Sequence, residues 1–292
     1  MIMKHFSIYN LLVLFLLLIM SCDEEKLTDT RIDMSDSTTT ELDEWIDATF
    51  RVPYNIRIQY KWNSAEMDPN KELVPPKEEL IQPFLKAVHK IWISPYTKVA
   101  KTNEDFMKDY SCRQLALIGS GSWNIGSVTL GIASNGYKIS LYVVNQFDLR
   151  EGQNGPSYGD LNQFFRTMHH EFGHILNQRK AYDPNFKNLT GNYSADWTSM
   201  SDREARELGF ISAYARSADT EDFVEVLSYF ITLTPTEWDV LLNTIRNTAG
   251  REYILLKLQS VSSYMNDFYG VDIILLRDEI TKAIAEVAEG VL

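Results

Sequence analysis

One pentapeptide constrains this chain more than any other feature: HEFGH at residues 170–174, inside an amphipathic run from Phe164 to Leu176. Two histidines four residues apart on a helix face the same way and can bind one metal ion. Glu171 lies about 60° around the helix from His174, close enough to act on a metal-bound water without binding the metal. A surface helix with two histidines beside a glutamate is the alternative. The flanking pattern and an acidic segment downstream favour a metal site.

A catalytic zinc site has three protein ligands and keeps a fourth position for water. No histidine follows His174 and no cysteine follows Cys112, so the third ligand is an upstream histidine or a downstream carboxylate. The metzincin extension is excluded, because Asn177 and Lys180 stand where that class has a glycine and a histidine.

The segment EDFVE at residues 221–225 holds the best candidate for the third ligand. Glutamates four residues apart share one helix face, so Glu221 can bind the metal while Glu225 hydrogen-bonds to a ligand histidine. Glu221 also falls in the first helical turn, where the helix dipole favours a carboxylate. An acidic first turn with no metal role is the alternative. His169 points about 100° away from His170 and is expected to be a cleft-wall or surface residue.

The N-terminus has the pattern of a signal peptide over residues 1–21: Lys4, then an apolar run at 11–20 that is too short to span a bilayer permanently. Its end resembles a bacterial lipobox, which implies that Cys22 is the lipidated first residue of a mature lipoprotein. A secretory signal with an incidental cysteine is the alternative. Residues 22–42 are polar and predict a flexible tether. The acidic residues 23–25 resemble the tag of surface-exported lipoproteins in some Gram-negative bacteria.

The net charge of −12 argues against a nucleic-acid partner, because such partners favour a basic face. If Cys22 is lipidated, Cys112 is the remaining thiol of the two in the chain, which leaves no intramolecular disulfide. We therefore expect packing to stabilise one large domain over residues 43–292, with an α/β upper part at 43–180 and a mostly helical lower part at 181–292.

Apolar periodicity predicts the elements of this domain. A strand is expected at 55–62, a helix at 76–96, and two strands at 127–134 and 137–147 that are joined by a turn at Asn135-Gly136. Ser201 and Glu204 have the form of a capping box that starts a short helix. Further helices are predicted at 220–234, 235–249, 253–269 and 272–291, with Gly250 between two of them. A sheet edge beside the metal helix could pair with an extended peptide substrate.

The stretch YARS at 214–217, followed by Glu221-x-Phe223-x-Glu225, resembles the catalytic domain of anthrax lethal factor, a gluzincin-type metallopeptidase. The whole chain is similar to lipoprotein zinc metallohydrolases associated with TonB-dependent import, which share the signal, the HEFGH helix and the EDFxE helix. This resemblance implies an α+β, zincin-like fold: a small mixed sheet with the active-site helix, then a mostly helical C-terminal part. It also implies one Zn²⁺ per chain, bound by His170, His174 and Glu221.

The same resemblance assigns further roles. Glu171 is the general base, Glu225 supports a ligand histidine, and Tyr214 donates to the oxyanion. A core or cleft tyrosine is the alternative for Tyr214, and a surface salt bridge accounts equally well for Arg216 or Asp222.

We expect a zinc-dependent peptidase that cleaves extracellular protein or glycoprotein, anchored in the outer membrane by its lipid and exposed on the cell surface, with the periplasmic face as the alternative. A TonB-dependent importer is a candidate partner. The competing hypothesis is a non-catalytic, zinc-containing accessory that binds substrate for such an importer. The presence of Glu171 argues against it, because a retired enzyme has no need of that residue. A purely structural zinc is disfavoured because structural sites are closed by four ligands rich in cysteine.

Overall fold

The computed structural model describes residues 39–64, 67–100, 103–124, 127–147 and 161–292, and residues 41–292 cluster into one folded unit. The predicted signal peptide at 1–21, Cys22 and nearly all of the tether at 22–42 lie outside the described residues, as does the glycine-rich stretch 151–159. Within the described ranges, no helix combines the length and the apolar character that a membrane crossing needs.

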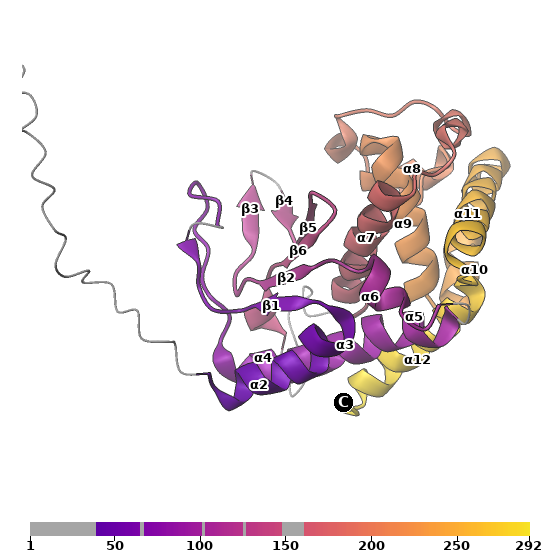
Figure 1. The fold of residues 1–292 in the computed structure, drawn as a ribbon. Coiled ribbons are helices and arrows are strands. Elements are labelled where there is room, and N and C mark those ends of the chain that lie inside the picture. The colour runs from indigo at the N-terminus through magenta and orange to yellow at the C-terminus, as the bar shows by residue number, and fades with distance from the viewer. Residues whose placement is uncertain (1–38, 65–66, 101–102, 125–126, 148–160) are drawn as a thin grey trace, which may run out of the picture. The chain divides into compact units, whose positions relative to one another are not determined.

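A mixed sheet forms the centre of the N-terminal half (Figure 1). Its four strands are ordered β1 (Arg57–Gln59), β2 (Gln114–Leu117), β6 (Lys138–Leu141) and β5 (Gly131–Ser134). The first three strands run parallel, and β5 pairs antiparallel with β6, so β5 is an edge strand. Beside this sheet, β3 (Ser122–Asn124) pairs antiparallel with β4 (Ser127–Thr129).

The turn between β5 and β6 is the one that the sequence predicts. Asn135 and Gly136 adopt φ angles of 53° and 68°. Positive φ at both central residues is the requirement of the tight hairpin turn that Asn-Gly favours. The strand β1 is shorter than the predicted 55–62, because it pairs with β2 on one side only and over three residues.

A long helical segment lies below the sheet in the view of Figure 1. It consists of α4 (Glu78–Val88), η3 (His89–Ile93) and α5 (Ser94–Val99), which together cover the predicted helix at 76–96. Its apolar residues are buried as their spacing predicts, among them Phe84, Leu85 and Trp92. The shorter elements of this half are α2 (Glu41–Ile46), η1 (Asp47–Arg51), α3 (Val52–Tyr54), α6 (Phe106–Tyr110) and η4 (Val144–Gln146).

The helix with the pentapeptide, α7 (Leu161–Arg179), lies between the sheet and the C-terminal helices. It packs against β5 and β6 on one side and against α9 (Asp219–Thr232) on the other. The remaining C-terminal elements are η6 (Pro184–Asn188), η7 (Trp197–Ser199), α8 (Asp202–Glu207), η8 (Tyr214–Ser217), α10 (Pro235–Asn243), α11 (Thr248–Tyr269) and α12 (Ile273–Ala288). The predicted α+β class with a mostly helical C-terminal part is confirmed.

Gly173 allows α7 and α9 to lie close together. A Cβ atom added at Gly173 would lie 2.8 Å from Cγ1 of Val224, which is closer than real Cβ atoms approach other atoms. The glycine therefore provides the space that the Val224 side chain occupies. Because Val224 lies between Glu221 and Glu225 on α9, this contact brings the two carboxylates to the histidine face of α7.

The predicted boundary between the helices at 235–249 and 253–269 is wrong. The break lies at residues 244–247, and Gly250 is inside α11 rather than before it. The Asn247 side chain caps α11 by accepting a hydrogen bond from the Ala249 amide. Glu207 accepts hydrogen bonds from the amides of Arg246 and Asn247, at 3.0 and 2.6 Å. The contacts made by Glu207 come from about 40 positions away, so apolar periodicity could not reveal them.

A buried ion pair joins α9 to α11. The Nζ atom of Lys257 lies 2.6 Å from Oδ2 of Asp222, and both side chains are fully buried. Tyr193 also donates a hydrogen bond to Asp222, and Lys257 donates one to the Gly209 carbonyl. The expectation of a surface salt bridge at Asp222 is therefore wrong: this carboxylate fixes the start of α9 from inside the core.

We expect Lys257→Met to destabilise the protein by about 3–5 kcal/mol, because it leaves the carboxylate of Asp222 buried without its partner. Urea unfolding followed by circular dichroism measures this change. Lys282→Met is the matched control, since the Lys282 side chain is 68% exposed and pairs loosely with Glu286 at 4.0 Å. A loss of equal size in both variants would contradict the assigned role of the buried pair.

Candidate metal centre

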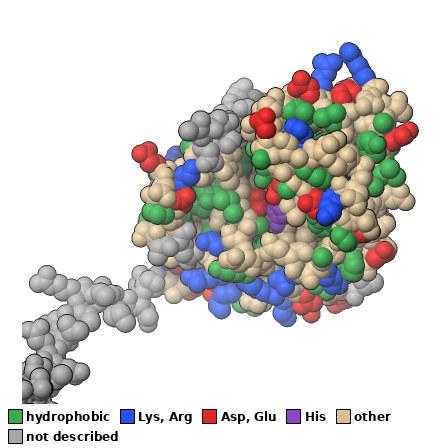
Figure 2. All heavy atoms as spheres, turned by 90° about the horizontal axis from the view of Figure 1, so that it is seen from above, with side chains coloured by type: hydrophobic (Ala, Val, Ile, Leu, Met, Phe, Trp, Pro, Cys, Tyr) green, Lys and Arg blue, Asp and Glu red, His purple; other side chains and the backbone are tan. Residues whose placement is uncertain are grey.

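Three side chains from two helices converge on one point. The Nε2 atoms of His170 and His174 lie 3.2 Å apart, and each lies 3.1 Å from Oε2 of Glu221. Among the described residues, these three are the group whose donor atoms could together hold a metal ion. The sequence predicted these ligands, and the fold brings them together. The space-filling view shows a histidine (purple) in a hollow of the surface, beside acidic side chains (Figure 2).

The donor set fits a zinc ion. Tetrahedral ligands with bonds of 2.0–2.1 Å to zinc would be separated from one another by about 3.3 Å. The three separations here are 3.1, 3.1 and 3.2 Å. Nitrogen and carboxylate oxygen are ligands that zinc accepts, and three protein ligands leave a coordination position open. The residues present could therefore hold a zinc ion with one coordination position left open.

Glu225 fixes the ring of His170. Its Oε1 atom lies 2.8 Å from Nδ1 of His170, and its Oε2 atom accepts a hydrogen bond from the Ser212 hydroxyl. A neutral His170 that donates its Nδ1–H to Glu225 presents the bare lone pair of Nε2 to the metal position. Ser212 also accepts a hydrogen bond from the Ala215 amide, which anchors the chain just before α9. The contact that the sequence predicts between Glu225 and a ligand histidine is present.

The electrostatics of the group favour a positive charge at its centre. Burial lowers the pKa of His170, but the hydrogen bonds to Glu221 and Glu225 outweigh burial and raise this pKa to about 10. Burial likewise raises the pKa of Glu221, and the hydrogen bonds to His170 and His174 outweigh it and lower this pKa below the usual range. The carboxylates of Glu221 and Glu225 thus balance the positive charge of a cation bound by the histidines, whether a proton or a metal ion.

Glu171 lies beside the metal ligands and lines a pocket of about 240 Å³. Its side chain is 7% exposed, and burial raises its pKa despite the opposing effect of the two histidines. Strand β5 passes directly over it: a Cβ atom added at Gly131 would lie 2.9 Å from Cγ of Glu171. The glycine lets the sheet edge approach the base closely. A carboxylate with a raised pKa beside a metal position is suited to accept and return a proton.

Tyr214, in η8, also lines this pocket. Its ring centroid is 5.9 Å from that of His170, and its edge contact with Trp197 fixes the ring from the other side. The side chain is 38% exposed, which makes it a cleft residue rather than a core residue. Burial and the neighbouring Glu221 raise the pKa of the phenol, so it stays protonated and can donate a hydrogen bond at neutral pH.

In the described part of the chain, the other two histidines do not belong to this group. His169 is fully buried, against Tyr96, so the expectation of a cleft-wall or surface position is wrong; burial lowers its pKa to about 3. His89 lies in η3 and contacts the Tyr54 hydroxyl at 3.3 Å. The upstream histidine His89 is therefore not the third ligand.

Arg216 is partly buried and donates a hydrogen bond to the Asn192 carbonyl.

Sequence reasoning missed two residues of the site. Ser212 completes the support of Glu225, but a serine two positions before Tyr214 carries no signal of that role. Arg166 lines the pocket of Glu171 and lies one helical turn before His170. The spacing of four residues could have placed Arg166 on the metal-binding face of the helix.

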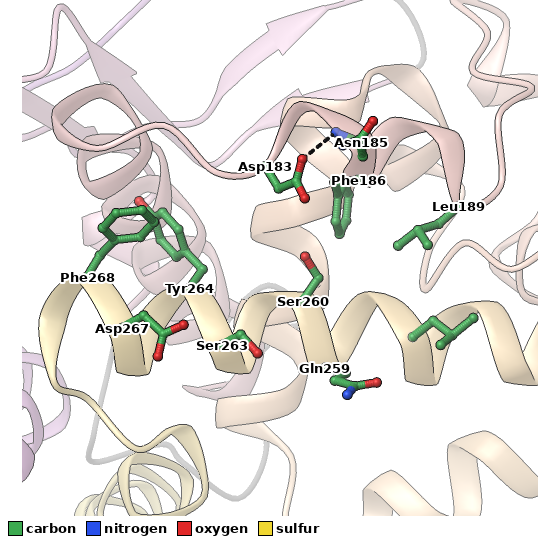
Figure 3. Close-up of a pocket in the computed structure, with 11 residues that line it drawn as sticks. Asp183, Asn185, Phe186, Leu189, Gln259, Ser260, Ser263, Tyr264, Asp267 and Phe268 are labelled. Carbon is green, nitrogen blue, oxygen red and sulfur yellow. Dashed lines mark hydrogen bonds between the residues drawn. The ribbon is translucent and has the colours of Figure 1, made fainter.

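A separate pocket of about 450 Å³ lies between α11 and the segment 183–189 (Figure 3). It contains no histidine, and the Asp183 carboxylate already accepts a hydrogen bond from the Asn185 amide at 2.9 Å. Its walls combine aromatic, aliphatic and uncharged polar side chains with Asp183 and Asp267, without a basic residue. This pocket lacks a metal-binding set, so the chemistry belongs to the group on α7 and α9.

Comparisons with known proteins agree with this geometry. A family model described as "Putative zinc-binding metallo-peptidase" matches residues 35–274. The crystal structure of a "putative zinc-binding metallo-peptidase" from Bacteroides caccae ATCC 43185 is 34% identical, with a TM-score of 0.72, and the similarity covers 88% of this chain and 96% of that chain. No curated protein matches the chain.

We expect Glu225→Gln to weaken zinc binding about 10- to 100-fold, because a neutral amide holds the Nδ1–H of His170 less firmly than a carboxylate does. Competition with a chelator of known affinity measures the change. Asp219→Asn is the control, since Asp219 shares the acidic first turn of α9 but hydrogen-bonds to Tyr182 instead of a histidine. Equal affinities for Glu225→Gln and the parent would refute the supporting role of Glu225.

Proposed function

This chain belongs to the family described as "putative zinc-binding metallo-peptidase", whose model spans most of its length, and we propose that it hydrolyses peptide bonds in extracellular protein or glycoprotein. One observation carries the proposal: a zinc-compatible set of two histidines and a carboxylate has a buried glutamate, Glu171, directly beside it in a substrate-sized pocket. A site that served only to hold metal would have no use for that glutamate.

The residues divide the reaction between them. His170, His174 and Glu221 would hold a zinc ion, which would supply Lewis-acid polarisation of a carbonyl and a lower pKa for water beside it. Glu171 takes the proton of the attacking water and passes it to the leaving amine. Its burial, which raises the pKa of the carboxyl group, helps it to hold that proton between the two steps. The Tyr214 hydroxyl donates to the carbonyl oxygen as negative charge develops there.

The edge strand β5 orients the substrate in this proposal. Its first residue, Gly131, and the preceding Leu130 border the pocket of Glu171, and Ala133 borders a second pocket, of about 550 Å³, that includes His174 and Glu221. An extended peptide that pairs with β5 therefore crosses the metal position from one pocket to the other. Main-chain hydrogen bonds to a sheet edge hold a peptide without requiring a particular sequence.

We expect the full chain to bind one zinc ion and to cleave members of a diverse peptide library. Glu171→Gln should retain the zinc and lose cleavage by a factor of at least 10²–10⁴, the usual contribution of a general base. Metal analysis and mass spectrometry of the library give the two readings separately.

The other outcomes discriminate between functions. Zinc binding without cleavage by the parent would favour the accessory that holds peptide or glycan for an importer. Equal cleavage by parent and Glu171→Gln would remove Glu171 from the mechanism. A parent without zinc would overturn the assignment of the site.

Tyr214→Phe isolates the proposed hydrogen bond to the developing oxyanion. Loss of one such donor costs about 3 kcal/mol of transition-state stabilisation, so kcat should fall about 100-fold while zinc content stays unchanged. Steady-state kinetics on a peptide from the library test this. A variant with the kcat of the parent would reduce Tyr214 to a residue of the cleft wall.

We also propose that the mature protein begins at a lipidated Cys22 and is held in the outer membrane, facing the cell surface, where a TonB-dependent importer could take up its products. The lipobox-like sequence before Cys22 supports the anchor, and the acidic residues 23–25 support display. Mass spectrometry of the mature N-terminus should find an acylated Cys22, and Cys22→Ala should release the protein from the membrane fraction. Protease accessibility on intact cells distinguishes the surface from the periplasmic face.

A further inference from the structure

Among its described lining residues, the pocket beside Glu171 contains one arginine and no lysine. Arg166 lines it together with Glu171, Tyr214 and Trp197, in a cavity of about 240 Å³. Arg166 lies on α7 one turn before His170, so it faces the same side of the helix as the metal ligands. Any substrate side chain that enters this cavity next to the metal lies within reach of a guanidinium group.

An aromatic ring holds Arg166 in position. Its guanidinium lies over the ring of Tyr229, with 4.2 Å between the central carbon atom and the ring centroid. In the part of the chain that the structure describes, this guanidinium forms neither a hydrogen bond nor an ion pair of its own. Stacking on an aromatic ring fixes its plane while its N–H groups stay available.

The two carboxylates that line the pocket with Arg166, those of Glu225 and Glu171, have other roles. Glu225 interacts with Arg166 electrostatically but already uses both oxygen atoms, one for His170 and one for Ser212. Glu171, which also faces this cavity, is the proton acceptor of the proposed reaction. An arginine that is oriented, partly buried and, among the described residues, without a carboxylate partner is suited to recognise an anion in a substrate pocket.

The two pockets that flank the metal ligands differ in charge. The described lining of the pocket on the His174 side includes Asp219 and Glu221 and neither lysine nor arginine, whereas the pocket on the His170 side includes Arg166 as well as Glu171 and Glu225. A peptide along β5 would thus find an attractive position for a negative group on one side only. This difference in charge would favour an acidic group in the substrate and would fix the side of the metal position on which that group lies.

We propose that Arg166 binds a carboxylate of the substrate and makes this hydrolase selective for an acidic group at the position that enters the pocket beside Glu171. This inference rests on the proposed peptidase function and names its substrate class. The carboxylate can belong to an aspartate or glutamate side chain or to the C-terminus of a peptide, and planar, two-point binding by guanidinium suits either.

Binding to the zinc-loaded, full-length Glu171→Gln protein tests the proposal without turnover. The probes are fluorescent, amidated octapeptide mixtures in which each position is fixed in turn as Glu or as Gln, and a second set of neutral peptides with either a free or an amidated C-terminus. Fluorescence anisotropy gives the affinities. Each set is measured again with Arg166→Gln and Arg166→Lys added, and with Arg203→Gln as the control for loss of one exposed positive charge.

We expect a preference of about tenfold or more for Glu over Gln at one position, or for the free over the amidated C-terminus. Arg166→Gln should abolish this preference, Arg166→Lys should reduce it because a lysine lacks the planar fork, and Arg203→Gln should keep it. Unchanged zinc content shows that the Arg166 variants retain the folded site.

Equal binding of every Glu and Gln pair and of both C-terminal forms overturns the proposal. A preference that persists in Arg166→Gln, or the absence of binding by any peptide, also overturns it. None of these results depends on cleavage, so a protein that hydrolyses the library without an acidic preference would refute the role of Arg166 and leave the peptidase function intact.

Discussion

The attraction between two imidazoles on α7 and two carboxylates on α9 is the interaction on which the rest of the site depends. Each helix alone carries charge of one kind on the relevant face, and either face would be costly to bury without the other. Together they place His170, His174 and Glu221 around one point and leave Glu225 to hold His170 in orientation. The sheet adds the second boundary, because β5 covers Glu171 and closes one side of the pocket.

The group of residues that could hold a metal ion was predictable because its signal is local. Helical spacing places His170 beside His174, and the same spacing places Glu221 beside Glu225, so each pair needs only its own helix to form. The contact between the histidine pair and the glutamate pair depends on the tertiary structure. It could be anticipated only because two complementary pairs occur in one chain and because the segments resemble a known family. The Asn135-Gly136 turn and the Ser201 capping box were predictable for the same reason: their chemistry is complete within a few residues.

The residues that escaped prediction act across long distances in the sequence. In the sequence, Lys257 is one charged residue on an ordinary helix. Its role comes from Asp222, 35 positions earlier, which lies 2.6 Å from it in the fold. The start of α11 depends on Glu207, and the support of Glu225 depends on Ser212. Arg166 has the helical spacing of a site residue, yet its place in the pocket, stacked on Tyr229 beside carboxylates that bind other groups, depends on tertiary contacts.

The contact between Gly173 and Val224 bears on how such chains can diverge. A search pattern of the form HExxH treats residue 173 as a wildcard, but here the neighbouring helix leaves no space for a side chain at that position. A larger residue at 173 would require a smaller one at 224, or the two helices would separate and carry the carboxylates away from the histidines. The volumes at positions 173 and 224 are therefore coupled, and the spacing of the two helices limits the residue at 173 even though it binds nothing itself.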